Sequence, residues 1–346
     1  MNLSVGIVGL PNAGKSTLFN ALVMQPAAKT GKYPFTTIDK NIGVVNVPDE
    51  TLYKLAVKES IEKVTPATIT FVDIAGLIKG ANVGEGLGNQ FLHHIREVDL
   101  ILHVVRFFKD ENVPHVHQKI DPEDDIEIIN DELLLSDIST LEKRLSDKKI
   151  TPQEKQVLQK YIEKLNQGIL ARDVSSTEEE KGIIASLNLL TMKKQLLVAN
   201  VSEDELKSNS SMLSICARLE AELIEFAWTE QQKLLKELGL PKERAKEKII
   251  LAAYKALDRI TFYTIAKRKE ARAWTIQKGA TALVAAGKVH TDFVKHFVKV
   301  EAINVVELIK IGSWHKAHEL GKIALHGRDY IVSDEDVLEF KVALKG

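Results

Sequence analysis

Two kinds of hydrophobic pattern alternate along this chain. Short apolar runs rich in β-branched residues occupy residues 3–8, 69–74, 195–199 and 212–215, each bounded by glycine or polar positions. Runs of this length and composition are typical of strands that are buried in a sheet. Between residues 126 and 165 the apolar positions instead recur every three or four residues, which predicts amphipathic helices. The chain is therefore expected to be an α/β protein with a helical insertion.

The helical insertion has a clear internal boundary. Thr151-Pro152-Gln153-Glu154 combines a capping box with proline at the first helical position. Two antiparallel helices should therefore form an arm between strands of the α/β domain. Residues 220–238 and 241–257 are predicted as helices that close that domain, and short strands and turns follow from about residue 262. The predicted boundaries are residues 1–125 and 191–261 for the α/β domain, 126–190 for the helical arm and 262–346 for a C-terminal domain.

Composition narrows the class of protein. The 346 residues are too many for one core, so two or three domains are expected. No apolar run approaches the ~18–20 residues of a membrane span, the chain opens on a predicted strand with no cleavable signal, and Cys216 is the single cysteine. These features predict a cytoplasmic protein with no membrane partner. Residues 262–346 carry a surplus of Lys and Arg, which fits either a nucleic-acid partner or an ordinary solvated surface.

Residues 9–17 carry the most specific motif. They read Gly9-Leu10-Pro11-Asn12-Ala13-Gly14-Lys15-Ser16-Thr17, between a predicted strand and a predicted helix. Glycines allow successive backbone N–H groups to turn towards a phosphate, and the helix N-terminus adds positive potential. Lys15 is expected to act on the terminal phosphates as a catalytic residue, and Ser16 is expected to bind Mg²⁺. The residues expected to bind a nucleoside triphosphate here are Asn12, Ala13, Gly14, Lys15, Ser16 and Thr17.

A second phosphate motif follows the predicted strand at residues 69–74. Asp73 stands at the strand end, and Gly76 follows it at D-x-x-G spacing. Ligands bind beyond the carboxyl ends of strands in doubly wound sheets, so Asp73 should join Ser16 around Mg²⁺ and the Gly76 N–H should meet the γ-phosphate. Thr37, which lies between the two motifs, could supply a second hydroxyl to Mg²⁺. Four glycines between residues 80 and 88 predict a segment that responds to the γ-phosphate.

Together these segments resemble the Obg family of P-loop GTPase-fold proteins, and within it the Obg-like ATPases of the YchF subfamily. The resemblance rests on residues 9–17, Tyr-Pro-Phe-Thr-Thr-Ile at 33–38, Asp-Ile-Ala-Gly-Leu-Ile-Lys-Gly-Ala at 73–81 and Gly-Glu-Gly-Leu-Gly-Asn-Gln-Phe-Leu-His-His-Ile-Arg at 84–96. It implies a doubly wound P-loop nucleotide-binding domain and a coiled-coil arm. It also implies a C-terminal TGS domain, a β-grasp module found in RNA- and ribosome-associated proteins.

Residues 200–203 would contact the base, and they depart from the GTPase pattern. GTPases of this fold carry N-K-x-D after this strand, and the aspartate accepts hydrogen bonds from guanine. Here the tetrad is Asn200-Val201-Ser202-Glu203, without the lysine and with a longer carboxylate at Glu203. Adenine has no 2-amino donor, and Asn200 can bond its N6 and N7. With backbone contacts from Val201 and a closing loop that includes Ala217, the tetrad predicts that ATP is preferred and GTP is the alternative.

Hydrolysis needs a group that orients water, and Leu77 replaces the glutamine that does so in Ras-like enzymes. The resemblance implies a histidine in the local pattern N-[IV]-x-H-V, which residues 112–116 match. His115 is therefore the catalytic candidate, because a histidine can position or deprotonate water near neutral pH. His117 is the alternative imidazole. Gln118 occupies a position where glycine is usual in the family.

Further ligands and partners follow from the same resemblance. Asn12 could help to bind potassium (K⁺), whose charge substitutes for an arginine finger, or could simply favour a turn. Residues 267–269 and Arg272 are basic and could face phosphates of ribosomal RNA. A monomer that binds the large ribosomal subunit is expected. Three functions remain open: a ribosome-associated ATPase switch, an Obg-type GTPase switch, and a ribosome-binding module that keeps its nucleotide as a structural ligand.

Overall fold

The chain forms two compact units. The computed structural model describes residues 3–24, 42–74, 87–207, 212–266 and 268–343. Unit 1 comprises Met1–Val45 with Ile69–Ala253, and unit 2 comprises Asn46–Thr68 with Tyr254–Gly346. Of the helices in these described ranges, none combines the length and the apolarity that crossing a bilayer requires.

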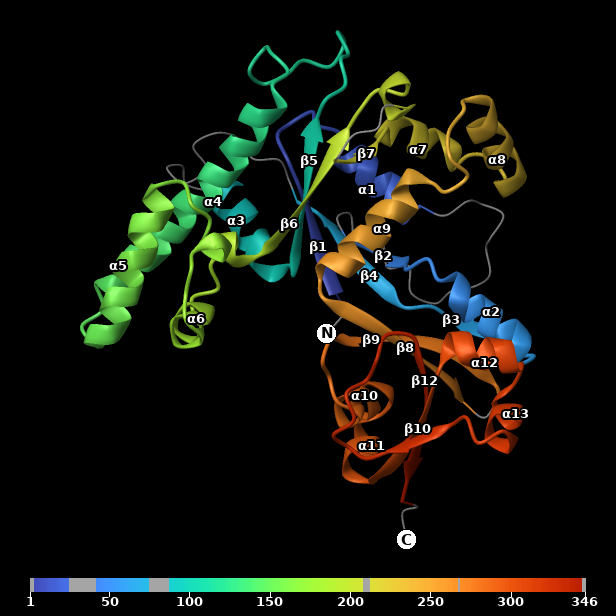
Figure 1. Cartoon of the computed structure of the whole chain (residues 1–346). Coiled ribbons are helices and arrows are strands. Elements are labelled where there is room, and N and C mark those ends of the chain that lie inside the picture. Colours follow the sequence, from blue (N-terminus) through green and yellow to red (C-terminus); the bar gives the residue numbers. More distant parts are fainter. Residues whose placement is uncertain (1–2, 25–41, 75–86, 208–211, 267, 344–346) are drawn as a thin grey trace. The chain divides into compact units, whose positions relative to one another are not determined.

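A six-stranded sheet in the order β2-β4-β1-β5-β6-β7 forms the centre of unit 1 (Figure 1). Strands β4, β1, β5, β6 and β7 run parallel to one another. Every residue of β5 is buried, as expected for a parallel strand that is covered on both faces. The strands are β1 (Leu3–Val8), β2 (Ile42–Asn46), β4 (Thr68–Asp73), β5 (Leu100–Arg106), β6 (Lys194–Asn200) and β7 (Leu213–Ile215).

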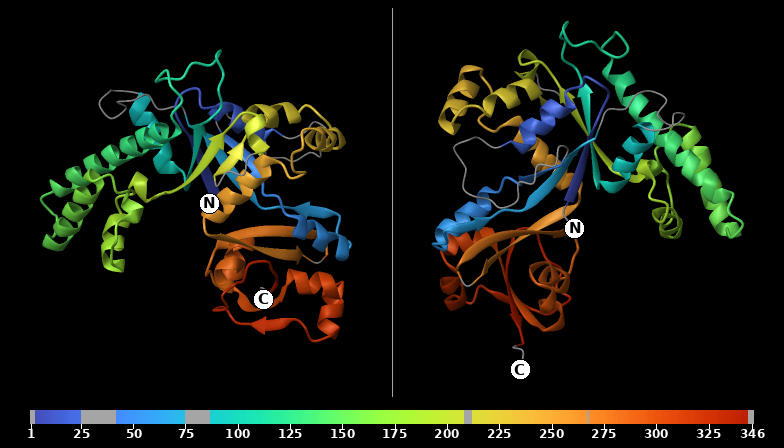
Figure 2. Two further views of the ribbon diagram at one scale, coloured as in Figure 1. Left: turned by 45° about the horizontal axis from the view of Figure 1, so that its top comes forward. Right: turned by 180° about the vertical axis from the view of Figure 1, so that it is seen from behind.

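Helices cover both faces of this sheet. α1 (Lys15–Val23) and α7 (Ala217–Leu223) lie on one face, and α3 (Leu87–Glu97) and α4 (Pro122–Leu145) lie on the other, as Figure 2 also shows from behind. On the second face β1, β5, α3 and α4 share one apolar core. This doubly wound arrangement confirms the predicted P-loop class of fold. The remaining helices of this part are α8 (Trp228–Glu237), α9 (Ala245–Ala256) and the 3₁₀ turn η4 (Asp204–Lys207).

The chain between β5 and β6 forms a helical insertion with its own core. The C-terminal half of α4, α5 (Pro152–Asn166) and α6 (Glu178–Ala185) pack around Leu141, Leu158 and Tyr161. Thr151 caps α5 by accepting a hydrogen bond from the Glu154 N–H, as predicted. The Glu154 carboxylate accepts from Arg144 Nε at 2.7 Å, however, so it serves the contact with α4 rather than a capping box. The 3₁₀ turns η2 (Ala171–Asp173) and η3 (Leu190–Met192) lead the chain back to β6.

Unit 2 contains a mixed sheet in the order β11-β10-β12-β8-β9-β3. β8 pairs antiparallel with β9, as does β10 with β11 and β12, whereas β12–β8 and β3–β9 are parallel. One face holds an apolar core that includes Phe262, Ala285 and Val300, and this arrangement agrees with the predicted β-grasp domain. Its strands are β3 (Lys63–Thr65), β8 (Arg259–Ala266), β9 (Glu270–Gln277), β10 (Phe297–Asn304), β11 (Ala324–His326) and β12 (Asp336–Val342). Its helices are α2 (Glu50–Lys58), α10 (Ala282–Val289), α11 (Thr291–Lys295), α12 (Val305–Ile311) and α13 (Trp314–Glu319).

Residues 46–68 depart from the predicted boundaries. Their sequence position assigns them to the α/β domain, whereas their contacts group them with unit 2. β3 pairs with β9 through Val64 and Ala271, and Thr65 Oγ1 donates to Glu270 Oε1 at 2.6 Å. These partners lie about 200 positions apart along the chain, so local patterning cannot reveal them.

Some predicted helices and strands also differ from the structure. The single helix expected at 220–238 is divided into α7 and α8, because the Glu230 carboxylate accepts from the Ala227 N–H and begins a second helix. The helix expected from residue 241 begins at Ala245. Residues 287–293, expected among the short strands and turns, lie in α10 and α11 apart from His290, which separates the two helices.

Candidate nucleotide-binding site

The phosphate loop (residues 9–16) connects β1 to α1 through three residues with left-handed backbone. Their φ values are +153° at Gly9, +64° at Asn12 and +92° at Gly14. A Cβ atom on Gly9 would lie 2.4 Å from the Val104 carbonyl oxygen, and one on Gly14 would lie 2.2 Å from Asn200 Nδ2. Both glycines are thus required by close packing as well as by their backbone conformation. The loop is held tightly at the N-terminus of α1.

Lys15 opens α1, and its side chain folds back over the loop. Its Nζ donates to the Leu10 carbonyl oxygen at 2.8 Å, and the residue is only 8% exposed. Burial lowers the pKa of this ammonium group, while the negative charge of Asp73 acts in the opposite direction. A partly desolvated cation gains more from an anionic partner than a hydrated one does. Lys15 therefore lies within the phosphate loop as a partly desolvated cation, and its contact with phosphate stays a prediction.

Two predicted metal ligands from distant parts of the chain lie together. Ser16 Oγ, in the first turn of α1, donates to Asp73 Oδ2, at the end of β4, over 2.8 Å. A hydroxyl and a carboxylate are the hard oxygen ligands that Mg²⁺ prefers, and Mg²⁺ commonly takes its other ligands from phosphate and water. The residues present therefore fit a magnesium ion. Thr37 and Gly76, the other residues predicted around the metal and the γ-phosphate, lie outside the described residues.

Asn200 connects the phosphate loop to the loop that should close over the base. Its Nδ2 donates to the Ala13 carbonyl oxygen at 2.9 Å, and its Oδ1 accepts from the Ala217 N–H at 3.1 Å. The residue is 4% exposed and lies at the end of β6. Each of the two amide atoms keeps capacity for one further hydrogen bond. The Asn200 side chain thus links Ala13 to Ala217, and only one hydrogen bond from Nδ2 and one to Oδ1 remain for a base.

The other residues predicted to contact the base differ in burial and in the hydrogen bonds that they already make within the protein. The Val201 N–H donates to the Ile215 carbonyl oxygen at 2.9 Å, so any backbone contact from Val201 to a base must come from its carbonyl group. Ala217 is buried and starts α7. Glu203 is exposed, as is Thr17 on α1.

His115 lies in the loop that follows β5, with its side chain only 5% exposed. Its Nε2 lies 3.1 Å from Asp125 Oδ2, and its Nδ1 accepts from the His117 N–H at 3.2 Å. Because Nδ1 is an acceptor, the neutral ring carries its proton on Nε2 and donates it to Asp125. Both ring nitrogens are therefore engaged. His117, the alternative imidazole, is exposed, with its ring centroid 6.0 Å from that of His115.

The His115 loop (residues 107–118) is tied to the phosphate loop. Asn12 Nδ2 donates to the Pro114 carbonyl oxygen at 2.9 Å, which joins the middle of one loop to the residue before His115 in the other. No sequence motif identifies two residues that contact this loop: Arg106, which ends β5, and Asp125, in the first turn of α4. The sequence indicates Arg106 only as a charged residue that ends a run whose other members, apart from His103, are apolar.

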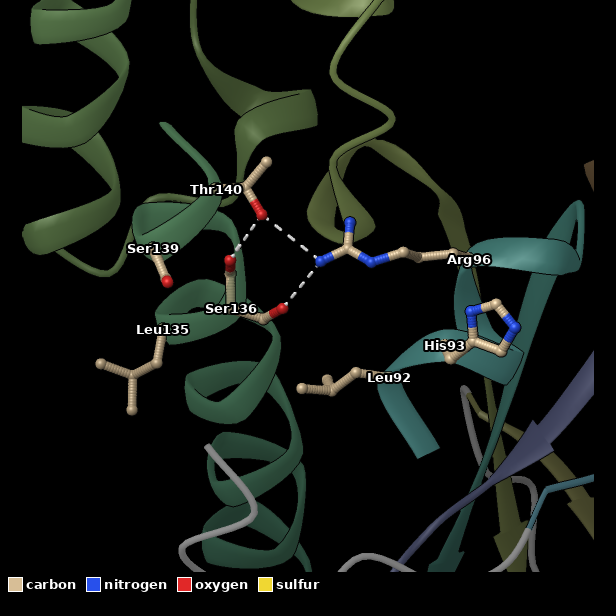
Figure 3. Close-up of a pocket in the computed structure, with 7 residues that line it drawn as sticks. All are labelled: Leu92, His93, Arg96, Leu135, Ser136, Ser139 and Thr140. Atoms are coloured by element: carbon tan, nitrogen blue, oxygen red, sulfur yellow. Dashed lines mark hydrogen bonds between the residues drawn. The ribbon is translucent and has the colours of Figure 1, made fainter. Parts of the chain in front are cut away.

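A pocket of about 280 Å³ lies between α3 and α4, and none of its lining residues belongs to the phosphate loop (Figure 3). Arg96 Nη2 donates to Ser136 Oγ at 3.1 Å and to Thr140 Oγ1 at 3.4 Å, and its Nη1 donates to the Asn188 carbonyl oxygen at 3.4 Å. Figure 3 shows the guanidinium reaching from α3 towards α4. This pocket marks a contact between α3 and the helical insertion, not the predicted nucleotide site.

The basic residues predicted to face RNA lie in unit 2, and Lys267 is outside the described residues. Arg268 and Lys269 are exposed, and Arg268 Nε lies 3.8 Å from Glu59 Oε2. The Arg272 guanidinium lies over the Trp274 ring at 4.0 Å from its centroid. These side chains are accessible, and two of them already have a protein partner.

Two family models match separate parts of the chain. Residues 4–171 match a family described as "50S ribosome-binding GTPase". Residues 259–343 match the C-terminal domain of YchF GTPases, a family described as "Protein of unknown function (DUF933)".

Relatives of the whole chain share one name. This chain is 43% identical to "Ribosome-binding ATPase YchF" of Bacillus subtilis, and the match covers 99% of each of the two chains. It is also 43% identical to the protein of that name in Escherichia coli O157:H7, and that match covers 98% of this chain and 99% of the other. The solved structure titled "Structure of the Schizosaccharomyces pombe YchF GTPase" matches with a TM-score of 0.86 at 34% identity, over 98% of each chain. The chain therefore belongs to the YchF family.

Proposed function

We propose that this chain is a Mg²⁺-dependent ATPase that uses the binding and hydrolysis of ATP as a conformational switch and associates with the ribosome. The observation that carries the proposal is the meeting of Lys15, Ser16 and Asp73 at one edge of the sheet, beside the Asn200 bridge. The relatives from Bacillus subtilis and Escherichia coli, which are alike over nearly the whole chain, are named ribosome-binding ATPases, and this supports the same activity here.

Binding of the phosphates would fall to the backbone N–H groups of residues 12–17 and to Lys15. Ser16 and Asp73 would hold Mg²⁺, with Thr37 as a further ligand, and the Gly76 N–H would meet the γ-phosphate. When bound, the ion would neutralise charge on the β- and γ-phosphates. The protein's own contribution is to fix these groups before the nucleotide arrives, and the 2.8 Å contact between Ser16 and Asp73 supports this preorganisation.

His115 would act on the attacking water, with Asp125 as its orienting carboxylate. The buried Asp125 holds Nε2–H, which leaves Nδ1 as the atom that accepts a proton. In the structure Nδ1 accepts from the His117 N–H, so the loop must release this bond before His115 can contact water. As Nδ1 takes the proton, the Asp125 carboxylate stabilises the imidazolium that forms. His117 has no comparable carboxylate partner among the described residues, which favours His115.

Preference for adenine would follow from what the tetrad at 200–203 lacks. Guanine requires a fixed carboxylate, and the exposed Glu203 does not supply one. The lysine of the GTPase pattern is also missing. Asn200 would use its remaining amide valences on adenine N6 and N7, with Val201 and Ala217 beside the ring. GTP is the alternative, and the Schizosaccharomyces pombe relative is titled a GTPase.

A potassium ion (K⁺) could add positive charge near the transferred phosphate, as an arginine finger does. We propose Asn12 Oδ1 as one of its ligands, because Asn12 Nδ2 is already used on Pro114 and holds the amide group in place. Its position in the middle of the phosphate loop supports this role.

The partner would be the large ribosomal subunit or its RNA, bound by a monomer in the cytoplasm. The match of residues 4–171 to a family described as 50S ribosome-binding supports the large subunit. Arg268, Lys269 and Arg272 would supply phosphate contacts.

Steady-state hydrolysis and nucleotide titration of the unaltered protein and three variants test the proposal. Lys15→Ala should lose both nucleotide affinity and turnover, whereas His115→Ala should keep affinity within about threefold and lose turnover by about 100-fold or more. His117→Ala is the matched control and should remain active. If the unaltered protein binds ATP without measurable turnover, the chain is instead a ribosome-binding module with a structural nucleotide. Full turnover by His115→Ala would contradict the proposed mechanism.

A further inference from the structure

Arg106 is a buried cation that has no acidic partner among the described residues. It ends β5, is 2% exposed, and no Asp or Glu carboxylate of the described chain lies within ion-pair distance of its guanidinium. A buried charge is costly unless other groups compensate for it. Here the compensation comes from backbone oxygens, all of which belong to one loop.

Four carbonyl groups of the His115 loop accept hydrogen bonds from this one side chain. Nε donates to Phe108 at 3.2 Å, Nη1 donates to Pro114 at 3.4 Å, and Nη2 donates to Val113 at 2.8 Å and to Asp110 at 3.5 Å. The guanidinium also lies 4.4 Å from the centroid of the Phe108 ring. A planar fork can serve four acceptors in one plane, which an ammonium group cannot do. Because all four acceptors are backbone carbonyl groups, Arg106 holds the loop through its backbone and not through its side chains.

The same loop is attached to the nucleotide site at two points. The Pro114 carbonyl oxygen, one of the acceptors of Arg106, also accepts from Asn12 Nδ2 of the phosphate loop at 2.9 Å. The N–H groups of Phe107 and Phe108 both donate to the Asn200 carbonyl oxygen, at 2.9 and 3.1 Å. Since Pro114 directly precedes His115, the position of this carbonyl group sets where the His115 backbone begins.

We propose that Arg106 is a positioning residue for hydrolysis: it fixes the backbone of the His115 loop beside the phosphate loop, so that His115 needs to release only its bond to the His117 N–H before Nδ1 can contact water. The proposal rests on the proposed role of His115. Arg106 contacts neither nucleotide nor water in this account, and it acts only through the loop. Its loss should therefore lower turnover and leave nucleotide binding intact.

Two substitutions and one control separate this role from a general effect on folding. Arg106→Lys keeps the charge and removes the fork, and Arg106→Met removes both. Arg172→Lys is the matched control, because Arg172 also donates to two backbone carbonyls and a side-chain oxygen, at Thr191, Lys193 and Gln195, far along the chain from the His115 loop. Amide hydrogen exchange of residues 107–118 reports the loop itself. Steady-state kinetics and nucleotide titration report its consequence.

The expected result has two parts. Amide hydrogen exchange in residues 107–118 accelerates in Arg106→Lys and not in Arg172→Lys. In Arg106→Lys, kcat falls about 10- to 100-fold, while the affinity for Mg·ATP changes by less than about threefold. In a His115→Ala background the further loss from Arg106→Lys should be small, because residues that act through one group are not additive. Unchanged amide hydrogen exchange of residues 107–118 in Arg106→Lys would overturn the proposal, whether or not His115 takes part in hydrolysis. An undiminished, additive loss of kcat in the His115→Ala background would also overturn it. High activity of His115→Ala alone would instead overturn the proposed function, and the exchange result would still decide the role of Arg106 in the loop.

Discussion

Ser16 Oγ and Asp73 Oδ2 lie 2.8 Å apart, although one begins a helix and the other ends a strand. β1 and β4 pair in parallel with Ile7 opposite Asp73, so the strand register itself brings the carboxylate to the edge where the phosphate loop begins. The two oxygens would be the protein's ligands to magnesium. The contact therefore connects the register of the sheet to the chemistry of the site.

Ser16→Ala should reduce the contribution of Mg²⁺ to nucleotide binding. Loss of one ligand to a charged centre costs about 1–3 kcal/mol, or about 5- to 160-fold in affinity. Titration of a fluorescent ATP analogue with and without Mg²⁺ measures this directly. Ser146→Ala is the control, because the exposed Ser146 hydroxyl only donates to the Lys143 carbonyl oxygen at the end of α4. Equal Mg²⁺ dependence in Ser16→Ala and in the unaltered protein would show that Ser16 is not a ligand.

Asn200→Ala should destabilise unit 1 as well as weaken nucleotide binding. The substitution leaves the Ala13 carbonyl oxygen and the Ala217 N–H buried without their partner, at a cost of about 1–3 kcal/mol each. Urea denaturation measures the change in the free energy of unfolding. Asn166→Ala removes an exposed amide that donates within its own helix and serves as the control. A loss no larger than that of the control would contradict the bridging role.

Gln118→Gly should stabilise the His115 loop. Gln118 has a φ of +59°, and its N–H donates to the His115 carbonyl oxygen at 3.0 Å in a tight turn. Left-handed backbone costs a residue other than glycine about 1–2 kcal/mol, partly offset by the greater freedom of glycine in the unfolded chain. The free energy of unfolding should therefore rise by at most about 1 kcal/mol in Gln118→Gly and fall in Gln118→Val. The opposite order in denaturation experiments would show that the turn has another conformation in solution.

Buried His103 should make the protein less stable as the pH falls. Burial, assisted by the charge of Lys15, lowers the pKa of this imidazole to about 3. The unfolded chain, with a histidine pKa of about 6.5, binds the proton that the folded chain excludes. The associated stability is therefore fully present above pH 6.5 and is lost between pH 6.5 and about 3, by at most about 1.4 kcal/mol per pH unit.

His103→Asn tests this dependence. The Asn Oδ1 can replace His103 Nδ1 as the acceptor for Gln195 Nε2, and asparagine does not titrate. Unfolding free energies between pH 4.5 and 7 should decline less steeply in this variant than in the unaltered protein. The exposed His94 provides the control substitution, His94→Asn, which should keep the full slope. Identical slopes in His103→Asn and the unaltered protein would contradict the assignment.

The parts of this site that lie within one motif could be predicted from the sequence. Residues 9–17 could be predicted as a phosphate loop, because their glycines lie between a predicted strand and a predicted helix, and Gly9, Asn12 and Gly14 have positive φ values before α1 begins. The pairing of Ser16 with Asp73 also follows, since the phosphate loop begins at the carboxyl end of β1 and Asp73 stands at the carboxyl end of the parallel strand β4. The helical insertion was predictable from its periodicity.

The remaining features depend on contacts between distant positions. Arg106 has no motif, and its role is visible only once the loop that follows β5 folds back over it. The tetrad predicts Asn200 as a base contact, but its bridge to Ala13 depends on the sheet order, in which only β5 lies between β1 and β6. Residues 46–68 join unit 2 through a pairing with β9 that no local pattern encodes.

Competition between Mg·ATP and Mg·GTP for the purified protein, with turnover followed in the same buffer, tests the central claim most directly. The account predicts that ATP binds at least about tenfold more tightly, a difference of about 1.4 kcal/mol, and is the nucleotide hydrolysed. Tighter binding and faster hydrolysis of GTP would show that the tetrad from Asn200 to Glu203 still serves guanine, and the ATPase assignment would be wrong.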